Sequence, residues 1–202
     1  SRDSLTAGSI GELAHTALKR LLRYLFSTSD QGLTYSFSGK PKPEWKMVHG
    51  YFDASLGDCP DTKRSTGGHC IFWFGCLVSW VSKLHPYVTT STNHSEYVAG
   101  AACARECAFQ GHLAEELGMK RPVFKLWSDS KGAISQTNNP TQRAATKHIE
   151  IADHYLREQS DMGRLEVNYI PTTEMVADIF TKPLVKVTFL KHREHLTGAC
   201  PE

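Results

Sequence analysis

Two carboxylates, each at the end of an apolar run, constrain the fold of this chain more than any other feature. Residues 47–54 form the first run, with Asp53 near its end, and residues 123–128 form the second, which Asp129 follows directly. Short apolar runs followed by small or turn-forming residues are typical of buried strands. A carboxylate at such a position is costly to bury unless a cation or hydrogen-bond donors stabilise it. The two aspartates therefore suggest a metal site.

The composition indicates one ordinary domain with a small addition. The chain has 202 residues, of which 40% are hydrophobic and 22% are charged, enough for a single core. The charges nearly balance, with 23 Lys and Arg residues and 21 Asp and Glu residues. Binding of a polyanion therefore has to come from local clusters of positive charge. No apolar run approaches the roughly 18 residues of a membrane span, and the N-terminus lacks a signal-peptide pattern. We therefore expect an intracellular protein without membrane contact, whose six cysteines are reduced thiols.

The order of the expected elements predicts an α/β fold. Three strands with short connections, over residues 47–54, 69–74 and 77–82, should form an antiparallel meander with a hairpin turn at Gly75 and Cys76. The remaining elements are a long helix over residues 95–117, strands over 123–128 and 165–170, and shorter helices over 131–137, 148–159, 174–181 and 186–196. We expect a five-stranded mixed sheet, with three antiparallel strands and then two further strands, flanked by helices.

The residues before the sheet are predicted to form a connection segment. Apolar residues recur with a helical period over residues 10–25, with basic residues on the remaining surface. Such a helix either docks on the protein with its basic face in solvent or binds a nucleic-acid backbone through its basic residues. A short strand over residues 32–37 and a Pro- and Lys-rich linker over 38–44 follow. The expected domains are this connection segment (residues 1–44), the α/β domain (residues 45–184) and a C-terminal helical tail (residues 185–202).

Four carboxylates are predicted to meet at one edge of the sheet. A right-handed crossover places the fourth strand beside the first, so Asp53 and Asp129 share an edge. Glu96 lies in the first turn of the connecting helix. Because it follows Asn93 by three residues, it also fits a capping-box-like turn. Asp178, between two apolar residues, faces either this cluster or water. Four such carboxylates would repel one another without divalent cations, and oxygen-only ligands favour Mg²⁺ or Mn²⁺, as in two-metal phosphodiester hydrolysis.

Seven short motifs in a fixed order resemble the ribonuclease H domain of Ty1/copia LTR-retrotransposon polyproteins. They are GYFD (residues 50–53), DCPDTKRSTG (58–67), SWVSK (79–83), SEY (95–97), WSD (127–129), TKHI (146–149) and ADIFTKPL (177–184). Residues 15–38 are similar to the segment that joins reverse transcriptase to ribonuclease H in the same polyproteins.

The resemblance implies a ribonuclease H-like fold, with Asp53, Glu96, Asp129 and Asp178 as the catalytic acids. These would hold two Mg²⁺ ions, with Mn²⁺ as a substitute. The implied activity is hydrolysis of the RNA strand of RNA–DNA hybrids during reverse transcription, with the reverse transcriptase domain of the same polyprotein as partner. The implied location is a cytoplasmic virus-like particle or the nucleus.

Further residues are candidates for contact with the hybrid. By resemblance, Asn93 would contact the 2′-hydroxyls of the RNA, although it can equally be a helix cap. Lys131, Arg143 and Lys147 could bind phosphates, and His148 is expected to pack or to position the substrate.

Some features depart from the family and leave alternatives open. Residues 93–97 read NHSEY where the family commonly has TEAEY, and residues 170–175 lack the histidine that cellular ribonucleases H carry before the last aspartate. One alternative function is an inactive or domesticated module that binds hybrid or a polymerase partner. Another is a different nuclease of the same fold, such as an integrase or exonuclease, against which the ordered motifs argue.

Overall fold

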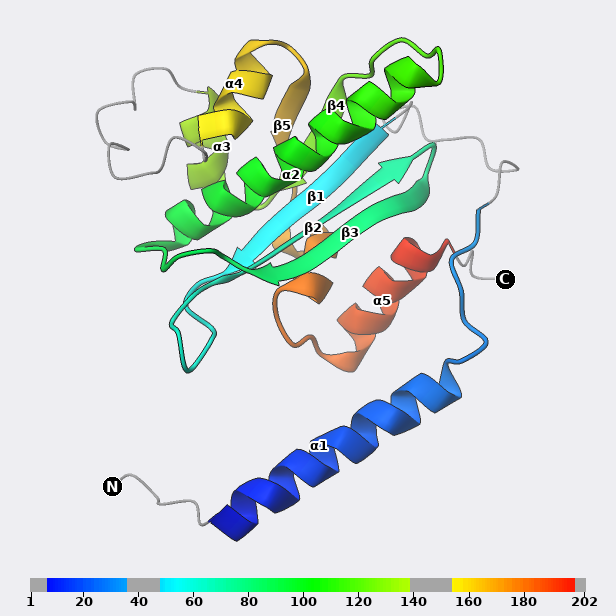
Figure 1. Ribbon diagram of the computed structural model, residues 1–202, viewed down its shortest axis with the longest axis vertical. Coiled ribbons are helices and arrows are strands. Elements are labelled where there is room, and N and C mark those ends of the chain that lie inside the picture. Colours follow the sequence, from blue (N-terminus) through cyan, green and yellow to red (C-terminus); the bar gives the residue numbers. More distant parts are fainter. Residues whose placement is uncertain (1–6, 36–47, 139–153, 199–202) are drawn as a thin grey trace. The chain divides into compact units, whose positions relative to one another are not determined.

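The computed structural model describes residues 7–35, 48–138 and 154–198, with side chains from residue 11 onward. The chain divides into two compact units, residues 1–33 and residues 34–202, and each is described by itself. The larger unit contains the sheet and all the candidate site residues that the structure describes (Figure 1).

The larger unit is built on one five-stranded sheet with the order β3-β2-β1-β4-β5. β1 pairs antiparallel with β2, β2 antiparallel with β3, and β1–β4 and β4–β5 are parallel. The strands are β1 (Val48–Ser55), β2 (Thr66–Trp73), β3 (Cys76–Leu84), β4 (Phe124–Ser128) and β5 (Leu165–Tyr169). This architecture confirms the predicted α/β fold, with three antiparallel strands and two further strands in a five-stranded mixed sheet flanked by helices.

The β2–β3 hairpin turns one residue earlier than predicted. Phe74 and Gly75 have φ values of 52° and 84°, and Cys76 already pairs with Trp73. A two-residue hairpin loop with positive φ at both central positions matches the right-handed twist of its strands. The predicted turn at Gly75 and Cys76 was therefore wrong in its register, because a strong preference for this turn outweighs the strain of Phe74 at positive φ.

Helix α2 (Thr92–Glu116) covers one face of the sheet, and its small residues allow a close approach. A Cβ atom added at Gly100 would lie 2.7 Å from Leu156 Cδ2 and 3.0 Å from Phe52 Cε2. Gly100 therefore lets β1 and α4 (Tyr155–Asp161) pack against the same point of α2. The short helix α3 (Lys131–Asn138) lies beside α2 and α4 (Figure 1). Residues 148–153 of the predicted helix 148–159 lie outside the described residues.

The opposite face of the sheet is covered by α5 (Lys186–Thr197) and by the segment before it. Tyr51 on β1 points to this side, where its ring meets His195 of α5 at 6.1 Å between centroids. The neighbouring Phe52 points to α2, because successive strand residues face opposite sides. Asp53 consequently points to the same face as Tyr51.

The helix predicted over residues 174–181 is not an α-helix. Two 3-10 helices form instead, η4 (Thr172–Glu174) and η5 (Val176–Phe180), and Met175 between them has extended backbone. The fully buried side chain of Met175 anchors this bend in the core. Burial of that side chain therefore outweighs the helical pattern of the sequence.

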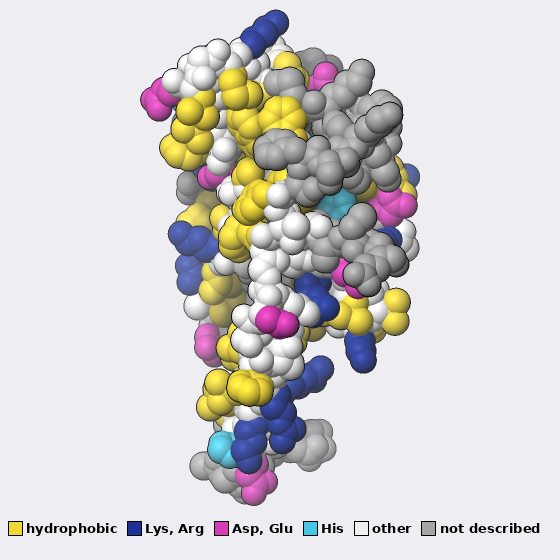
Figure 2. All heavy atoms as spheres, turned by 90° about the vertical axis from the view of Figure 1, so that its right-hand side faces the viewer, with side chains coloured by type: hydrophobic (Ala, Val, Ile, Leu, Met, Phe, Trp, Pro, Cys, Tyr) yellow, Lys and Arg dark blue, Asp and Glu magenta, His cyan; other side chains and the backbone are white. Residues whose placement is uncertain are grey.

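The N-terminal unit consists of α1 (Ala7–Ser27), which is longer at both ends than the predicted helix 10–25. Figure 2 shows Lys and Arg side chains of this helix gathered together at the lower end of the view. The described part of the predicted strand 32–37, residues 32–35, is not a strand. Thr34 already belongs to the larger unit, and among the described residues its backbone N donates to Thr197 O of α5 at 2.8 Å, not to a strand. Residues 38–44, the predicted linker, lie outside the described residues.

The described residues include no helix long and apolar enough to cross a membrane. The five described cysteines, Cys59, Cys70, Cys76, Cys103 and Cys107, are free thiols.

Candidate functional site

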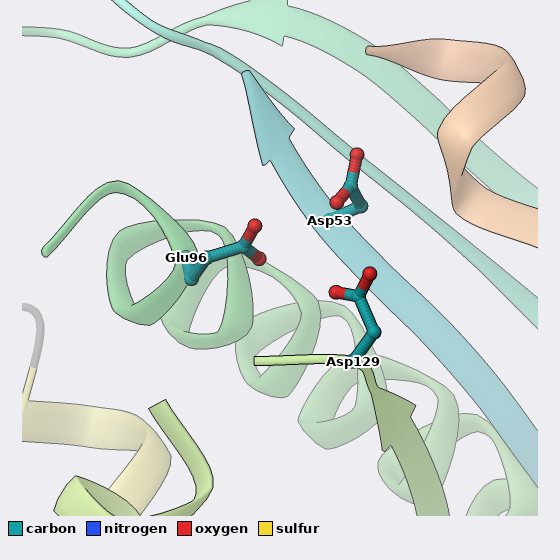
Figure 3. Close-up of side chains that lie close together, drawn as sticks. All are labelled: Asp53, Glu96 and Asp129. Atoms are coloured by element: carbon teal, nitrogen blue, oxygen red, sulfur yellow. The ribbon is translucent and has the colours of Figure 1, made fainter. Parts of the chain in front are cut away.

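Three carboxylates from three different elements converge at one edge of the sheet. Asp53 lies near the end of β1, Asp129 directly follows β4, and Glu96 is in the first two turns of α2. One oxygen of each lies within 4.8 Å of the others, and Figure 3 shows all three side chains pointing toward one another. The convergence follows from the parallel pairing of β1 and β4, because parallel strands end at the same edge. We call Asp53, Glu96 and Asp129 the acidic triad.

Two members of the acidic triad are buried, and the third, Asp129, is half-buried. Asp53 is 1% exposed and Glu96 is 4% exposed. Burial, followed by the negative charges of Asp53 and Asp129, raises the pKa of Glu96 to about 9. Without a cation, Glu96 therefore favours its protonated form at neutral pH.

The residues of the acidic triad fit a divalent cation bound by oxygen. Glu96 Oε2 is buried and has no hydrogen-bond partner among the described residues, although it faces two other carboxylates. Burying a carboxylate oxygen without a hydrogen-bond donor costs free energy, and a bound cation would offset that cost. The described residues contain this one group of three or more metal-binding side chains, and it includes neither His nor Cys. Such a set of ligands suits Mg²⁺ or Mn²⁺ better than Zn²⁺.

Asp178, the fourth predicted acid, lies beside the acidic triad but is not part of the group within 4.8 Å. It is buried in η5, and its Oδ1 lies 2.9 Å from Lys182 Nζ. Burial raises the pKa of Asp178 to about 6; the hydrogen bond from Lys182 opposes this effect, and the charges of Asp53 and Asp129 add to it. The structure thus brings together three of the four predicted acids and places the fourth against a lysine at their edge.

The segment from Thr172 to Lys182 supplies three further side chains that sequence reasoning missed. Thr172 donates from its hydroxyl to Asp129 Oδ2 at 2.7 Å, and Thr181 donates from its hydroxyl to Asp53 Oδ2. Lys182 Nζ lies 3.5 Å from Asp53 Oδ2. The sequence does carry a signal, since Thr181 and Lys182 follow Asp178 within one turn. Their contact with Asp53, however, depends on how η5 packs on the sheet.

The structure describes two of the predicted nucleic-acid contacts, Asn93 and Lys131. Ser91, not Asn93, caps α2, because its hydroxyl oxygen accepts a hydrogen bond from His94 N at 3.2 Å. Asn93 is exposed at the start of α2 and its side chain lies against Gly132. Lys131 is exposed at the start of α3, with its ammonium 5.3 Å from the ring centre of Tyr169. The other three candidates, Arg143, Lys147 and His148, lie outside the described residues.

No family model matches the chain. Over 173 residues it is 32% identical to the retrovirus-related Pol polyprotein from transposon TNT 1-94 of Nicotiana tabacum. It is 34% identical over 176 residues to that from transposon RE2 of Arabidopsis thaliana. Each match covers 86% of this chain. The homologues of this chain are Ty1/copia-type retrotransposon Pol polyproteins. Among them is also the Ty1-ER2 Gag-Pol polyprotein of Saccharomyces cerevisiae, 31% identical over 171 residues, or 84% of this chain.

The similarity to Pol polyproteins covers most of this chain but a small part of each relative. The chain spans 13%, 12% and 10% of the lengths of these three polyproteins. The similarity is therefore to one segment of each Pol polyprotein, and the resemblance to Ty1/copia polyproteins drawn from the seven motifs is confirmed.

Two solved structures that are similar to this chain are ribonucleases H. The RNase H1 of the halophilic archaeon Halobacterium salinarum NRC-1 has 19% sequence identity and a TM-score of 0.43, covering 75% of this chain and 98% of the archaeal one. LC11-RNase H1, isolated from compost, has 18% identity and a TM-score of 0.45, covering 67% of this chain and 93% of the other.

Proposed function

We propose that this chain is the ribonuclease H domain of a retrotransposon Pol polyprotein and that it hydrolyses the RNA strand of RNA–DNA hybrids. The observation that carries the proposal is the acidic triad, whose oxygens gather within 4.8 Å at the end of β1 and β4. The homology to Pol polyproteins supports the same function, because reverse transcription produces RNA–DNA hybrids.

In this proposal, Asp53, Glu96, Asp129 and Asp178 would hold two divalent cations, Mg²⁺ or Mn²⁺. When bound, the cations would activate the attacking water and stabilise the leaving oxygen of an in-line displacement. The protein's own task is to hold the carboxylates in place. Thr172 fixes Asp129 and Thr181 fixes Asp53 through hydroxyl hydrogen bonds, so both aspartates keep one oriented oxygen before any cation arrives.

Hybrid recognition is proposed for the helix starts next to the acidic triad. The exposed Asn93 lies three residues before Glu96 on α2, and its side chain would contact an RNA 2′-hydroxyl in the minor groove. Lys131 would bind a phosphate from the start of α3. We also retain phosphate binding by Arg143 and Lys147, and substrate positioning by His148, as predictions from the sequence.

The proposed partner is the reverse transcriptase domain of the same polyprotein. The relatives carry the name Pol polyprotein, and the matched segment is about a tenth of their length. The basic helix α1 belongs to the part of the chain that resembles the junction between the two activities. Because of that role, the proposed location is a cytoplasmic virus-like particle or the nucleus.

One observation favours a second candidate, an inactive module that binds hybrid or a polymerase partner without cleaving. Lys182 already pairs with Asp53 and Asp178, so part of the site is neutralised without a metal ion. A protein that had lost its cations would be stabilised by such a pairing.

Cleavage of a labelled RNA–DNA hybrid in Mg²⁺ distinguishes the two candidates. We expect the wild type to cut the RNA strand, and Asp53→Asn and Asp129→Asn to lose the activity. Asp161→Asn, purified in the same way, is the matched control, because Asp161 is exposed on α4. Hybrid binding by the wild type with no cleavage in Mg²⁺ or Mn²⁺ would favour the inactive module.

A further inference from the structure

The side chain of Lys182 bridges two carboxylates of the candidate site. Its Nζ lies 2.9 Å from Asp178 Oδ1 and 3.5 Å from Asp53 Oδ2. Its backbone is also fixed, because Lys182 N donates to Asp178 O at 3.1 Å. The ammonium thus joins η5 to the end of β1.

This bridge differs from an ordinary surface ion pair. The two carboxylate side chains are 1% and 7% exposed, whereas the lysine side chain is 37% exposed. An exposed pair contributes little because water screens it, but a buried carboxylate is expensive without a positive partner. Lys182 therefore stabilises carboxylates that the fold has already removed from water.

The same bridge divides the site into two halves. Glu96 and Asp129 have no ion pair with Lys182, and the oxygens of the acidic triad face one another. Asp53 belongs to both halves, but Lys182 and Thr181 both contact its Oδ2, so a cation held by the triad can use Asp53 Oδ1 while the ammonium stays in place. A cation that binds Asp178 comes close to the Lys182 ammonium, whose Nζ lies 2.9 Å from Asp178 Oδ1, and the two positive charges repel each other.

We infer that Lys182 is a positioning residue that serves as the built-in counter-ion of Asp178 and Asp53 and competes with the divalent cation on that half of the site. The inference rests on the proposed function, since it concerns the same carboxylates. Divalent cations consequently bind in two classes, a tighter one at the acidic triad and a weaker one that displaces the ammonium from Asp178. The exposed end of the side chain gives the displaced ammonium a path into solvent.

Mn²⁺ binding to the free protein tests this inference without substrate. Lys182→Met keeps most of the length of the side chain and removes its charge. We expect the weaker class of Mn²⁺ sites to tighten about tenfold in this variant and the tighter class to change less than about twofold. The melting temperature of the metal-free protein should fall, because two buried carboxylates lose the lysine ammonium as their counter-ion.

Two further variants show whether the effect belongs to the charge at this position. Lys182→Arg keeps a positive charge, and we expect it to restore both the two classes and the metal-free stability. Lys191→Met is the matched control, because the Lys191 ammonium donates to Thr173 O in the same segment at 3.1 Å. Its Mn²⁺ affinities should equal those of the wild type.

Unchanged Mn²⁺ affinities in Lys182→Met would overturn the inference, as would loss of the weaker class, which would make the lysine a helper of metal binding. One Mn²⁺ in both proteins would also overturn it, whereas one in the wild type and two in Lys182→Met would support it. Failure of the proposed function is a separate result: a wild type that cleaves no hybrid, while Lys182→Met still tightens Mn²⁺ binding, refutes the nuclease and leaves the counter-ion in place.

Discussion

Gly68 on β2 is the direct cross-strand partner of Asp53 on β1, and its missing side chain leaves the space that η5 fills. A Cβ atom at Gly68 would lie 2.6 Å from Phe180 Cβ and 2.9 Å from Thr181 Cγ2, closer than van der Waals contact allows. Ser82 holds the same turn from β3, since its hydroxyl donates to Phe180 O at 2.6 Å. The position of the Thr181 hydroxyl on Asp53 therefore depends on a glycine in another strand.

Gly68→Ala should impair the site more than the fold. The methyl group pushes η5 outward and separates Thr181 and Lys182 from Asp53. We expect hybrid cleavage to fall by about 100-fold, as a displacement of about 1 Å can cause, and stability to fall by about 1–3 kcal/mol. Cleavage assays and urea unfolding measure the two effects.

The neighbouring Gly67 provides the control for this substitution. A Cβ atom at Gly67 would clash with the His85 ring on the opposite face of the sheet, away from η5. Gly67→Ala should therefore lose a similar amount of stability and keep most of its cleavage activity. Equal loss of cleavage in the two variants would refute the specific role of Gly68.

Asp129→Asn should stabilise the metal-free protein. The change removes one charge from the acidic triad and leaves an oxygen that can still accept the Thr172 hydroxyl. Relief of repulsion between close charges should add about 1 kcal/mol, which corresponds to about 2–4 °C in melting temperature for a domain of this size. Thermal unfolding in a chelator measures this gain.

Mg²⁺ should reverse that order. The wild type gains stability because the ion binds the folded state alone, whereas Asp129→Asn loses most of this gain. The exposed Asp161→Asn should behave as the wild type under both conditions. A metal-free Asp129→Asn protein less stable than the wild type would show that the charge of Asp129 does not destabilise the metal-free site.

The meeting of Asp53 with Asp129 was predictable from the sequence, whereas the surroundings of the fourth acid were not. The apolar pattern locates both strand ends, and the right-handed crossover places them side by side. Each of these rules uses local sequence or a general feature of α/β folds. The parallel pairing of His49 with Lys125 and of Tyr51 with Trp127 confirms their result.

The parts that sequence reasoning missed depend on packing between distant elements. Residues 174–181 have a helical pattern, but burial of Met175 bends them into two 3-10 turns. That bend directs Thr181 and Lys182 to Asp53, which no periodicity could indicate. The cap of α2 was missed for a different reason: Ser91 and Asn93 are both good cap residues, and the backbone places the cap at Ser91.

Acid should destabilise the fold through two buried histidines. His49 and His69 are 1% and 4% exposed. Burial, with a smaller effect of His195, lowers the pKa of His49 to about 4; burial likewise lowers the pKa of His69 to about 4. Below pH 6.5 the unfolded chain binds protons that the folded chain does not, so this stability is present above pH 6.5 and is lost as the pH falls toward 4.

The loss should reach about 2 kcal/mol per histidine between pH 7.5 and pH 5. Urea unfolding at these two pH values measures it. His49→Gln should lose less stability on acidification than the wild type, because one of the two groups no longer titrates. His112→Gln changes an exposed histidine on α2 and should keep the full loss. The same loss in His49→Gln would exclude this residue as a cause.

Ser91 and Asn93 should separate the stability of α2 from hybrid recognition. Ser91→Ala removes the hydroxyl that accepts from His94 N, so unfolding free energy should fall by about 1 kcal/mol. Asn93→Ala leaves the cap intact and should change stability by less than about 0.5 kcal/mol. If Asn93 contacts the RNA 2′-hydroxyl, its removal should weaken binding of a hybrid about tenfold and leave binding of a DNA duplex unchanged. Fluorescence anisotropy in a chelator compares the two ligands without cleavage. An equal loss of affinity for both would assign Asn93 to backbone contact, since a DNA duplex offers no 2′-hydroxyl to lose.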